Sequence, residues 1–374
     1  MRRRISKLSV LSLILLAGLL LASCAPAAQP APAPAPTRPA APSPAPATPA
    51  APAPAPAKPR DIIEVGGLFG SVGSVTITQG MVLAKMLKDY SPFLRMTPIP
   101  TEGYAKGVEY WDKTQGKGHY ALAFTTTMMT EYAQGVRTYA KQGPRSDLSL
   151  LWVVNQLDYF SVAKKSTGIE TSEQLKNALK SGTKVGLGTP GTTSYIITKA
   201  YLEDGLGLQP TEYNAVYAAI NDLIGLYKEG TVDIAMWGHI GSKGLPYPYL
   251  ENMTSGGGVS NFIPHSQAEV DRMNKSLGGS IYSLDTAPAG LYRGMTKDTP
   301  WVSGATFLAL PKAYPDDIAY EMARVWWDRH DEGIDINPLV AHSDIGKNKI
   351  AVKGKWEFPY HTGAVKFYKE RGWL

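Results

Sequence analysis

The sequence has little or none of several features that carry common functions. It contains one cysteine among its 374 residues, Cys24, which excludes a disulfide framework and thiol chemistry in the rest of the chain. Residues 1–59 contain no acidic and no aromatic residue, but they hold six of the 38 bases. Residues 60–374 therefore carry 32 bases and 32 acids, and the net charge of +6 belongs to the N-terminal segment. A neutral folded region offers no basic surface for nucleic acid, so a nucleic-acid partner is excluded.

Motifs of enzymes and metal sites are also missing. The chain has no G-x-S-x-G nucleophile elbow, no Walker loop, no EF-hand loop and no H-E-x-x-H pair. Its six histidines show no metal-ligand spacing, and we interpret His361 as a structural hydrogen-bonding residue near the C-terminal helix. The glycines of residues 186–191 fit the dinucleotide pattern G-x-G-x-x-G, but the next strand, residues 213–217, does not end in an acid that would hold a ribose. We expect no enzyme activity, no metal and no cofactor.

The first 23 residues have the features of a secretory signal. Three arginines at the start are followed by an apolar stretch, residues 8–21, which is too short to span a bilayer comfortably. The sequence Leu-Ala-Ser-Cys at 21–24 resembles the lipobox of bacterial lipoproteins, in which small residues admit the signal peptidase and the cysteine thiol accepts a diacylglycerol. We expect cleavage before Cys24, lipidation of Cys24, and an extracytoplasmic protein anchored to the cell membrane by its lipid.

Residues 24–60 form a linker of low complexity. Of the 29 prolines, 14 lie between residues 25 and 59, where alanine and proline alternate almost without interruption. Proline removes backbone donors and favours polyproline II, so neither a helix nor a sheet is expected here. At about 3.1 Å per residue the segment could reach about 100 Å. We interpret it as a tether between the lipid anchor and a folded region.

From residue 61 onward, short apolar runs alternate with amphipathic segments. The strand-like runs are residues 62–65, 94–99, 120–124, 148–154, 159–163, 184–187, 232–236 and 301–310. Helical segments are expected near 75–88, from 128, and at 171–180, 192–203, 221–228, 315–327 and 362–370. The first follows a Gly/Ser loop at 66–74, and the others follow other polar turns. This alternation predicts an α/β fold with parallel sheets.

Three strand ends are followed by small polar residues and a helix, at residues 66–74, 125–127 and 186–194. Ligands of open α/β sheets bind at the carboxyl ends of strands, and the amides of a helix N-terminus attract anions. These loops predict a cleft for a carboxylate, although glycines needed only for their turns are the alternative explanation. Aromatic residues and a histidine near strand ends are further candidates. The predicted ligand-binding residues are Ser71, Val72, Gly73, Ser74, Thr125, Thr126, Gly191, Thr192, Thr193, Trp237, His239 and Tyr292.

The order of several segments resembles the solute receptors of TRAP transporters, in particular the TAXI group. The resemblance covers residues 61–374, with two departures: Val75-Thr76-Ile77 stands where the group has a Tyr-Tyr-Pro-like turn, and Thr362 stands where a proline is expected. The matching motifs are the Gly-rich start after residue 65, the Gly-Pro-Gly-Thr loop at 185–193, the strand at 233–237, the Pro-Ala-Gly element at 287–294 and the C-terminal segment 358–372.

The resemblance implies two α/β lobes of the periplasmic-binding-protein type II fold, joined by hinge strands near Leu151–Phe160 and Trp301–Leu310. We expect lobe 1 to comprise residues 61–155 and 301–374, and lobe 2 residues 156–300. The resemblance further implies a receptor that closes around a small organic anion and passes this anion to a TRAP-type membrane permease driven by an ion gradient. The alternatives are the substrate-binding lipoprotein of an ABC importer, a cell-surface lipoprotein enzyme, and a purely structural lipoprotein.

Overall fold

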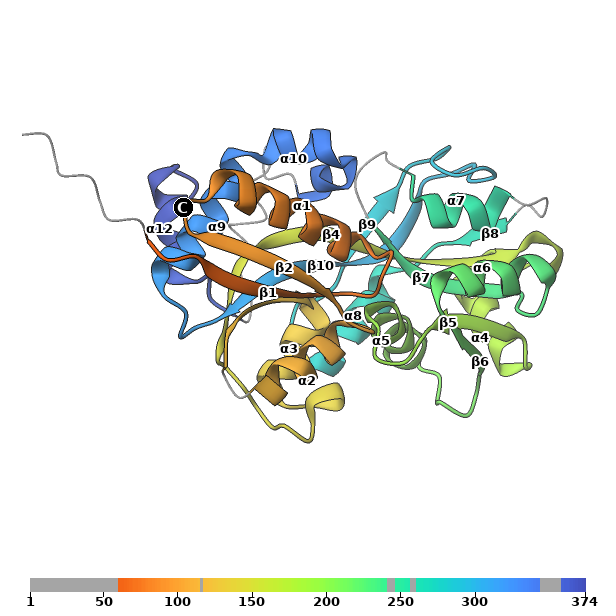
Figure 1. Ribbon diagram of the computed structural model, residues 1–374. Helices are drawn as coiled ribbons and strands as arrows, with labels where there is room; N and C mark the ends of the chain where they lie inside the picture. The colour runs from red at the N-terminus through yellow and green to blue at the C-terminus, as the bar shows by residue number, and fades with distance from the viewer. Residues whose placement is uncertain (1–59, 115–116, 241–245, 256–259, 344–357) are drawn as a thin grey trace, which may run out of the picture. The chain divides into compact units, whose positions relative to one another are not determined.

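The structure, a computed structural model, describes residues 60–114, 117–240, 246–255, 260–343 and 358–374 (Figure 1). The predicted signal peptide, Cys24 and all but the last residue of the tether lie outside the described residues. In the described part of the chain, no helix is both long enough and apolar enough to cross a membrane.

The ten strands of the described residues belong to one continuous sheet of order β2-β1-β3-β10-β4-β7-β5-β6, with β8 added to β4 and β9 added to β10. Pairing is parallel among β1, β2 and β3 and among β5, β6 and β7, as expected where helices connect successive strands. The strands are β1 (Ile63–Phe69), β2 (Leu94–Pro100), β3 (His119–Thr125), β4 (Leu148–Lys164), β5 (Lys184–Gly188), β6 (Asn214–Ala218), β7 (Ile234–Ile240), β8 (Ser260–Ile263), β9 (Ser283–Ala287) and β10 (Thr299–Pro311).

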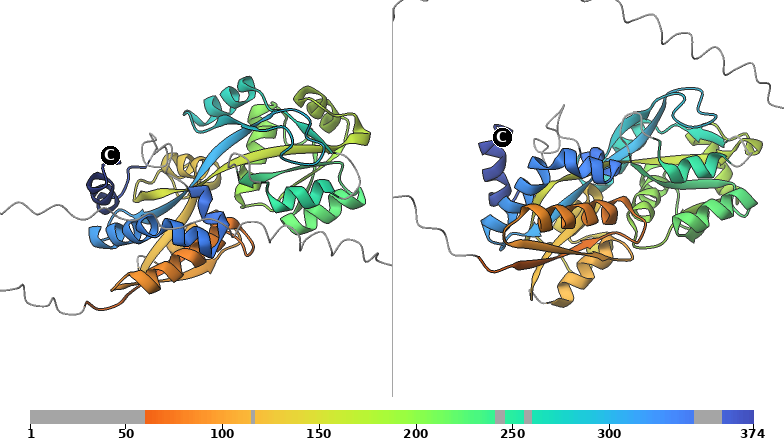
Figure 2. Two further views of the ribbon diagram at one scale, coloured as in Figure 1. Left: turned by 90° about the horizontal axis from the view of Figure 1, so that it is seen from above. Right: turned by 45° about the horizontal axis from the view of Figure 1, so that its top comes forward.

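Two long antiparallel strands, β4 and β10, link the two parallel groups. β10 continues the first group by pairing with β3 through Thr306–Ala309, while β4 continues the second by pairing with β7 through Leu157–Ala163. Figure 2 shows both strands running from one group to the other. The predicted fold class, two α/β lobes joined by such strands, is confirmed. The predicted residue boundaries of the lobes stay a prediction.

Helices cover both faces of the sheet, and several begin at side chains that bond to their first free amides. Thr171, the first residue of the helix predicted at 171–180, is the N-cap of α4 and forms a capping box with Gln174. His361 likewise accepts a hydrogen bond from the amide of Gly363 and so has the structural role expected of it. The helices are α1 (Val75–Tyr90), α2 (Tyr104–Thr114), α3 (Thr126–Gln134), α4 (Ser172–Lys180), α5 (Thr193–Ala200), α6 (Ile220–Glu229), α7 (Pro248–Ser255), α8 (Gln267–Leu277), α9 (Asp316–Asp328), α10 (His330–Ile336) and α12 (Thr362–Glu370).

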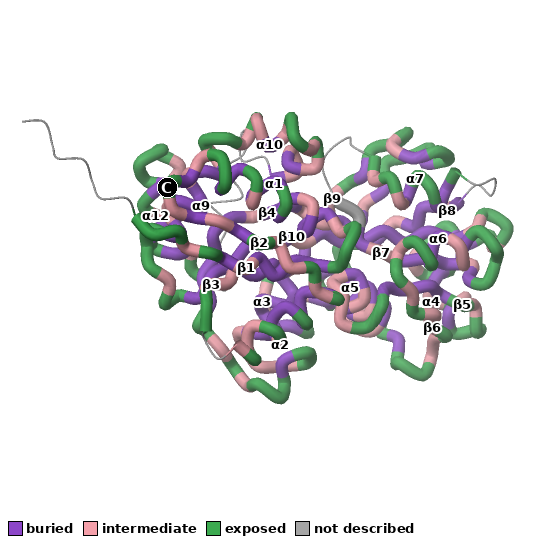
Figure 3. Tube along the Cα trace, viewed as in Figure 1, coloured by how far each residue is buried: buried purple, intermediate pink, exposed green. Residues whose placement is uncertain are grey.

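The core follows the sheet (Figure 3). The larger buried cluster lies around β1, β3, β4 and β10, and it includes Trp152 stacked on Trp326 with ring centroids 5.3 Å apart. A second cluster packs around Phe160, Leu223 and Trp301 in the lobe that contains β7. The larger cluster continues into the lobe of β5 and β7 through Val185, Leu187 and Ile197, so both lobes share apolar packing across the linking strands.

Several element boundaries differ from the sequence prediction. The predicted loop at 66–74 begins only at Gly70, because β1 continues to Phe69. Gly66 and Gly67 are strand residues in close packing: a Cβ on Gly66 would lie 2.7 Å from the ring of Tyr120. The predicted helix 192–203 is α-helical only to Ala200 and then widens into a π-helical turn, η3 (Tyr201–Gly205). The two predicted strands within 148–163 are one continuous strand, β4.

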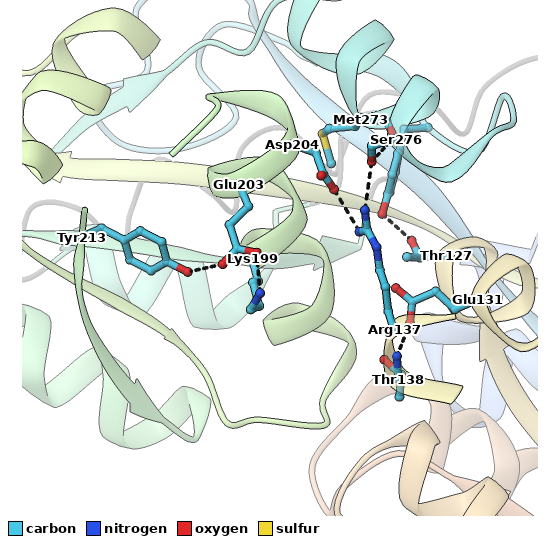
Figure 4. Close-up of polar contacts among 11 residues, drawn as sticks. Thr127, Glu131, Arg137, Thr138, Lys199, Glu203, Asp204, Tyr213, Met273 and Ser276 are labelled. Atoms are coloured by element: carbon cyan, nitrogen blue, oxygen red, sulfur yellow. Dashed lines mark hydrogen bonds and ion pairs between the residues drawn. The ribbon is translucent and has the colours of Figure 1, made fainter. Parts of the chain in front are cut away.

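Polar contacts join the two lobes beside the linking strands (Figure 4). Arg137, in the short 3-10 helix η1 (Arg137–Tyr139), forms an ion pair with Asp204 of η3 at 2.9 Å and donates to the Ser276 hydroxyl at 3.0 Å. Gln134 donates to the carbonyl of Leu277 at 3.0 Å. Arg137 has φ of 49°, a left-handed conformation that costs a non-glycine residue about 1–2 kcal/mol. The ion pair with Asp204 and the hydrogen bond to Ser276 hold Arg137 in this conformation.

Candidate ligand-binding site

A cavity of about 570 Å³ opens where the two lobes meet. Its lining comes from the loops after β1, β2 and β5, from the middle of β4 and of β7, and from the starts of α6 and α7. These are mainly strand ends and helix starts, the places where α/β folds hold ligands. The lining residues used below are Ser74, Thr76, Glu102, Gly103, Tyr104, Lys106, Asn155, Thr192, Thr193, Ser194, Trp237, Gly238, Tyr247 and Tyr249.

The first turn of α1 provides donors to the cavity. The Thr76 hydroxyl oxygen accepts hydrogen bonds from the Gly70 amide at 3.4 Å and the Tyr104 phenol at 3.1 Å, and it lies 3.2 Å from the Ser74 hydroxyl. With its acceptor positions used, Thr76 donates its hydrogen to Ser74. Ser74 also accepts from the third amide of the helix, so its own hydrogen is left for another acceptor. The amides of Val75 and Thr76 open the helix and have no carbonyl partner within it.

Burial raises the pKa of Tyr104 to about 12. The phenol keeps its proton at neutral pH, and in its hydrogen bond with Thr76 the phenol is the donor. Because Thr76 accepts a hydrogen bond from Tyr104, Thr76 can donate its own hydrogen to Ser74. The hydroxyl hydrogen of Ser74 is then left for another acceptor.

The first turn of α5 provides a second set of donors. The Thr192 hydroxyl is fully used, since it donates to the carbonyl three residues earlier at 2.7 Å and accepts from the third amide of the helix at 3.3 Å. The Ser194 hydroxyl accepts from the amide of Gly238 on β7 at 3.2 Å and keeps its own hydrogen to donate. The amides of Thr193 and Ser194 are the first two of the helix. Together the two helix starts present four amides and two hydroxyl hydrogens around one cavity.

Loops from the two lobes touch beside these helix starts. A Cβ on Gly103 would lie 2.5 Å from the carbonyl oxygen of Gly191, and Gly103 has φ of 148°, so both the backbone conformation and the close approach require glycine. The Tyr249 phenol reaches the carbonyl of Gly73 at 3.4 Å. These contacts connect the loops after β1 and β2 to the loop after β5 and to α7.

Charged side chains in the described lining lie at its edge. Glu102 and Lys106 are both exposed, and Lys106 is paired with Glu109 at 2.8 Å. At the floor, by contrast, Asn155 of β4 is only 1% exposed, and its side-chain oxygen has no hydrogen-bond partner. In the described part of the chain, no group of three or more His, Cys, Asp or Glu residues could hold a metal ion.

Residues 72–372 match the NMT1-like family. The chain belongs to the NMT1-like family. The match spans most of the sequence, including both lobes and the two helix starts at the cavity. The TAXI group within TRAP receptors stays a prediction.

Solved structures similar to this NMT1-like chain include three proteins of low sequence identity. MatC from Rhodopseudomonas palustris with bound malate is 16% identical, with a TM-score of 0.47 over 79% of this chain and 93% of MatC. A TctC solute binding protein from Polaromonas is 15% identical, with a TM-score of 0.44 over 76% and 88%. A second R. palustris protein, with adipate, is 14% identical, with a TM-score of 0.44 over 84% and 93%.

Most of the residues predicted for the site border this cavity. One set belongs to the loop after β1, another to the start of α5, and Trp237 belongs to β7. Gly191 lies in the loop between two lining residues, where its carbonyl faces Gly103. The predicted residues in the lining are Ser71, Val72, Gly73, Ser74, Thr192, Thr193 and Trp237.

The other predicted residues lie elsewhere. Thr125 and Thr126 are buried away from the lining, because Thr125 pairs with Thr306 of β10 and Thr126 accepts from the Ala305 amide at 3.4 Å. Tyr292 is buried too, but its hydroxyl accepts from the amide of Tyr247 at 2.9 Å and so positions a lining residue. His239 belongs to β7, and its side chain lies outside the described residues.

Sequence reasoning missed several lining residues. Ser194 directly follows the predicted pair Thr192 and Thr193, and its place in the first helical turn was a readable signal. Asn155, in the middle of an apolar strand, is a polar residue in a buried run and could have been found on that ground. Tyr247 and Tyr249 follow a Gly/Pro-rich segment that has no periodicity and gave no signal.

Proposed function

We propose that this protein is an extracytoplasmic receptor that binds a small organic anion in the cavity and transfers it to a membrane permease without changing it chemically. One observation carries the proposal: the first residues of two helices far apart in sequence, α1 and α5, line the same cavity, and their amides have no partner within the helix. Free amides and the positive end of the helix dipole together favour a negatively charged group.

A carboxylate suits this set of donors. Its two oxygens can accept bonds from the first amides of one helix and from the hydroxyl hydrogen of Ser74 or Ser194. A hydrogen bond to a charged group contributes about 1.5–3 kcal/mol, and each helix dipole adds about 0.3–1 kcal/mol or more where it is partly buried. These contributions act against the cost of immobilising a small ligand, so the affinity rises with the number of donors that reach the carboxylate.

The finer assignments rest on the sequence. The lipobox supports a lipid anchor at Cys24, and the tether supports a receptor held at a distance from the membrane. The resemblance to TAXI receptors supports a TRAP-type permease as the partner. In this proposal the linking strands β4 and β10 act as hinges, and ligand bound between the lobes favours the closed arrangement because it contacts both.

A proline scan of helix starts tests the site directly. Thr193 is the first residue of α5, where proline fits a helix and removes only an amide that has no helical partner. Thr192 has φ of −83° and ψ of 156°, the extended conformation that a residue before proline requires. We expect Thr193→Pro to weaken the tightest carboxylate found by calorimetry, from a panel that includes malate and adipate, by about tenfold or more.

Two control variants separate the amide from other effects. Thr193→Val removes the hydroxyl but keeps the amide, so it should weaken binding much less. Ser172→Pro makes the same change at the first residue of α4, outside the cavity, where Thr171 is extended as well. All three variants should melt within a few degrees of the parent. Unchanged affinity in Thr193→Pro, with the panel bound as before, would remove α5 from the site and with it the proposed function.

A further inference from the structure

We propose that the ligand is a carboxylate with a flat apolar body, such as an arylalkanoate, rather than a short hydrophilic dicarboxylate. This inference rests on the proposed function, since it uses the same cavity and the same helix starts. It follows from the side chains that complete the lining opposite the loops of small polar residues.

Four aromatic residues belong to the lining. Trp237 stands in the middle of β7, and Tyr247 and Tyr249 stand at the start of α7 with ring centroids 5.2 Å apart. All three are only partly buried and pack against the second core cluster, so the protein supports them from behind. Tyr104 adds a fourth ring from α2. Rigid aromatic side chains bind flat apolar groups at low cost in conformational entropy.

The aromatic residues stand next to residues that contact both helix starts. Trp237 immediately precedes Gly238, whose amide bonds to the Ser194 hydroxyl in the first turn of α5. Tyr249 reaches Gly73 in the loop that leads into α1. A molecule whose carboxylate sits at either helix start therefore has aromatic surface available for its other end.

The volume of the cavity favours such a body. At about 570 Å³ the cavity lies within the roughly 300–1,000 Å³ typical of sites that hold drug-sized ligands. A four-carbon dicarboxylate would leave most of that space to water beside exposed aromatic faces. A monocarboxylate with a ring fills more of it, and releasing water from apolar surface is favourable at about 25 cal/mol per Å².

Calorimetry with matched ligands tests this inference on the full-length protein in detergent. The probes are 3-phenylpropionate, butanoate, which has the same carboxylate and no ring, and adipate. We expect 3-phenylpropionate to bind at least tenfold tighter than either of the others. Trp237→Ala should reduce that ratio to about threefold or less, while Thr193→Pro should weaken all bound carboxylates and leave the ratio unchanged.

A second pair of variants guards against a folding defect in Trp237→Ala. Trp237→Phe keeps a ring and should preserve the preference, and Tyr249→Ala removes a half-buried ring from α7 and should reduce it. Adipate binding as tightly as 3-phenylpropionate, or a ratio that no ring variant changes, would overturn the inference while Thr193→Pro still supported an anion site. Loss of sensitivity to Thr193→Pro would instead refute the proposed function itself.

Discussion

Asp158 gives the sharpest prediction about stability. It lies on β4, opposite Ser303 of β10, and is 4% exposed, with one carboxylate oxygen that has no hydrogen-bond partner. Burial and, to a smaller extent, the nearby Asp285 carboxylate raise the pKa of Asp158 to about 7, while hydrogen bonds from Ser303 and Gln156 oppose the change. The folded protein therefore holds this proton much more tightly than the unfolded chain does.

The direction of the pH dependence follows from that difference. A carboxyl whose pKa is raised on folding contributes stability that is fully present below its unfolded pKa of 3.8 and is lost as pH rises through about 7. A pKa change from 3.8 to about 7 corresponds to about 4 kcal/mol. Asp158→Asn keeps the shape of the protonated side chain and cannot ionise, so it should equal the parent near pH 4 and exceed it by up to about 4 kcal/mol at pH 8.

Urea unfolding of the parent and of Asp158→Asn at pH 4, 5, 6, 7 and 8 measures this difference. Other groups titrate in the same range, but they do so in both proteins and cancel in the subtraction. Asp298→Asn, at an exposed position, is the control and should leave the pH profile of the parent unchanged. Curves for the parent and Asp158→Asn that differ by the same amount at every pH would refute the reasoning.

Two further predictions concern the contacts between the lobes and the lipid anchor. Arg137→Gly should be more stable in urea than Arg137→Ala by about 1 kcal/mol, because φ of 49° strains alanine but not glycine; equal stabilities would argue against the left-handed conformation. Cys24→Ala should move the expressed protein from the membrane fraction to the soluble extracytoplasmic fraction, as detected by immunoblotting, since it removes the only thiol that can accept the lipid. A variant that stayed with the membranes would contradict lipid anchoring at that residue.

The elements that the sequence predicts well are those with a strong local signal. Alternating apolar runs place most of the strands that build the sheet, and Thr171 marks the start of α4 through its capping box with Gln174. Ser266 and Glu269 form the same kind of capping box at the start of α8. The pair can be recognised in the sequence, but the segment that follows it is only weakly apolar. Local chemistry therefore predicts where elements begin better than it predicts which polar segments become helices.

Glycines are harder to interpret, because a strand in close packing and a flexible loop use the same residue. Gly66 and Gly67 precede a Gly/Ser segment and look like its start, yet they are paired with β2 and β3. Phe69 explains why residues 67 and 80 are glycines, since its ring lies within 2.3–2.4 Å of where a Cβ on Gly67 or Gly80 would be. Only the tertiary contact separates this packing role from a turn.

The site itself depends on topology more than on side chains. Backbone amides make most of the proposed contacts with the ligand. Every helix start has such amides, so the sequence alone predicts that the three similar loops contribute equally to the site. The start of α3 is excluded because β10 pairs with β3 and the Ala305 amide bonds to Thr126, which covers that end. The starts of α1 and α5 stay open because they follow β1 and β5, strands that do not neighbour β10. Strand order therefore decides which helix starts reach ligand, and a variant that alters side chains at Thr125 or Thr126 should affect stability before it affects binding.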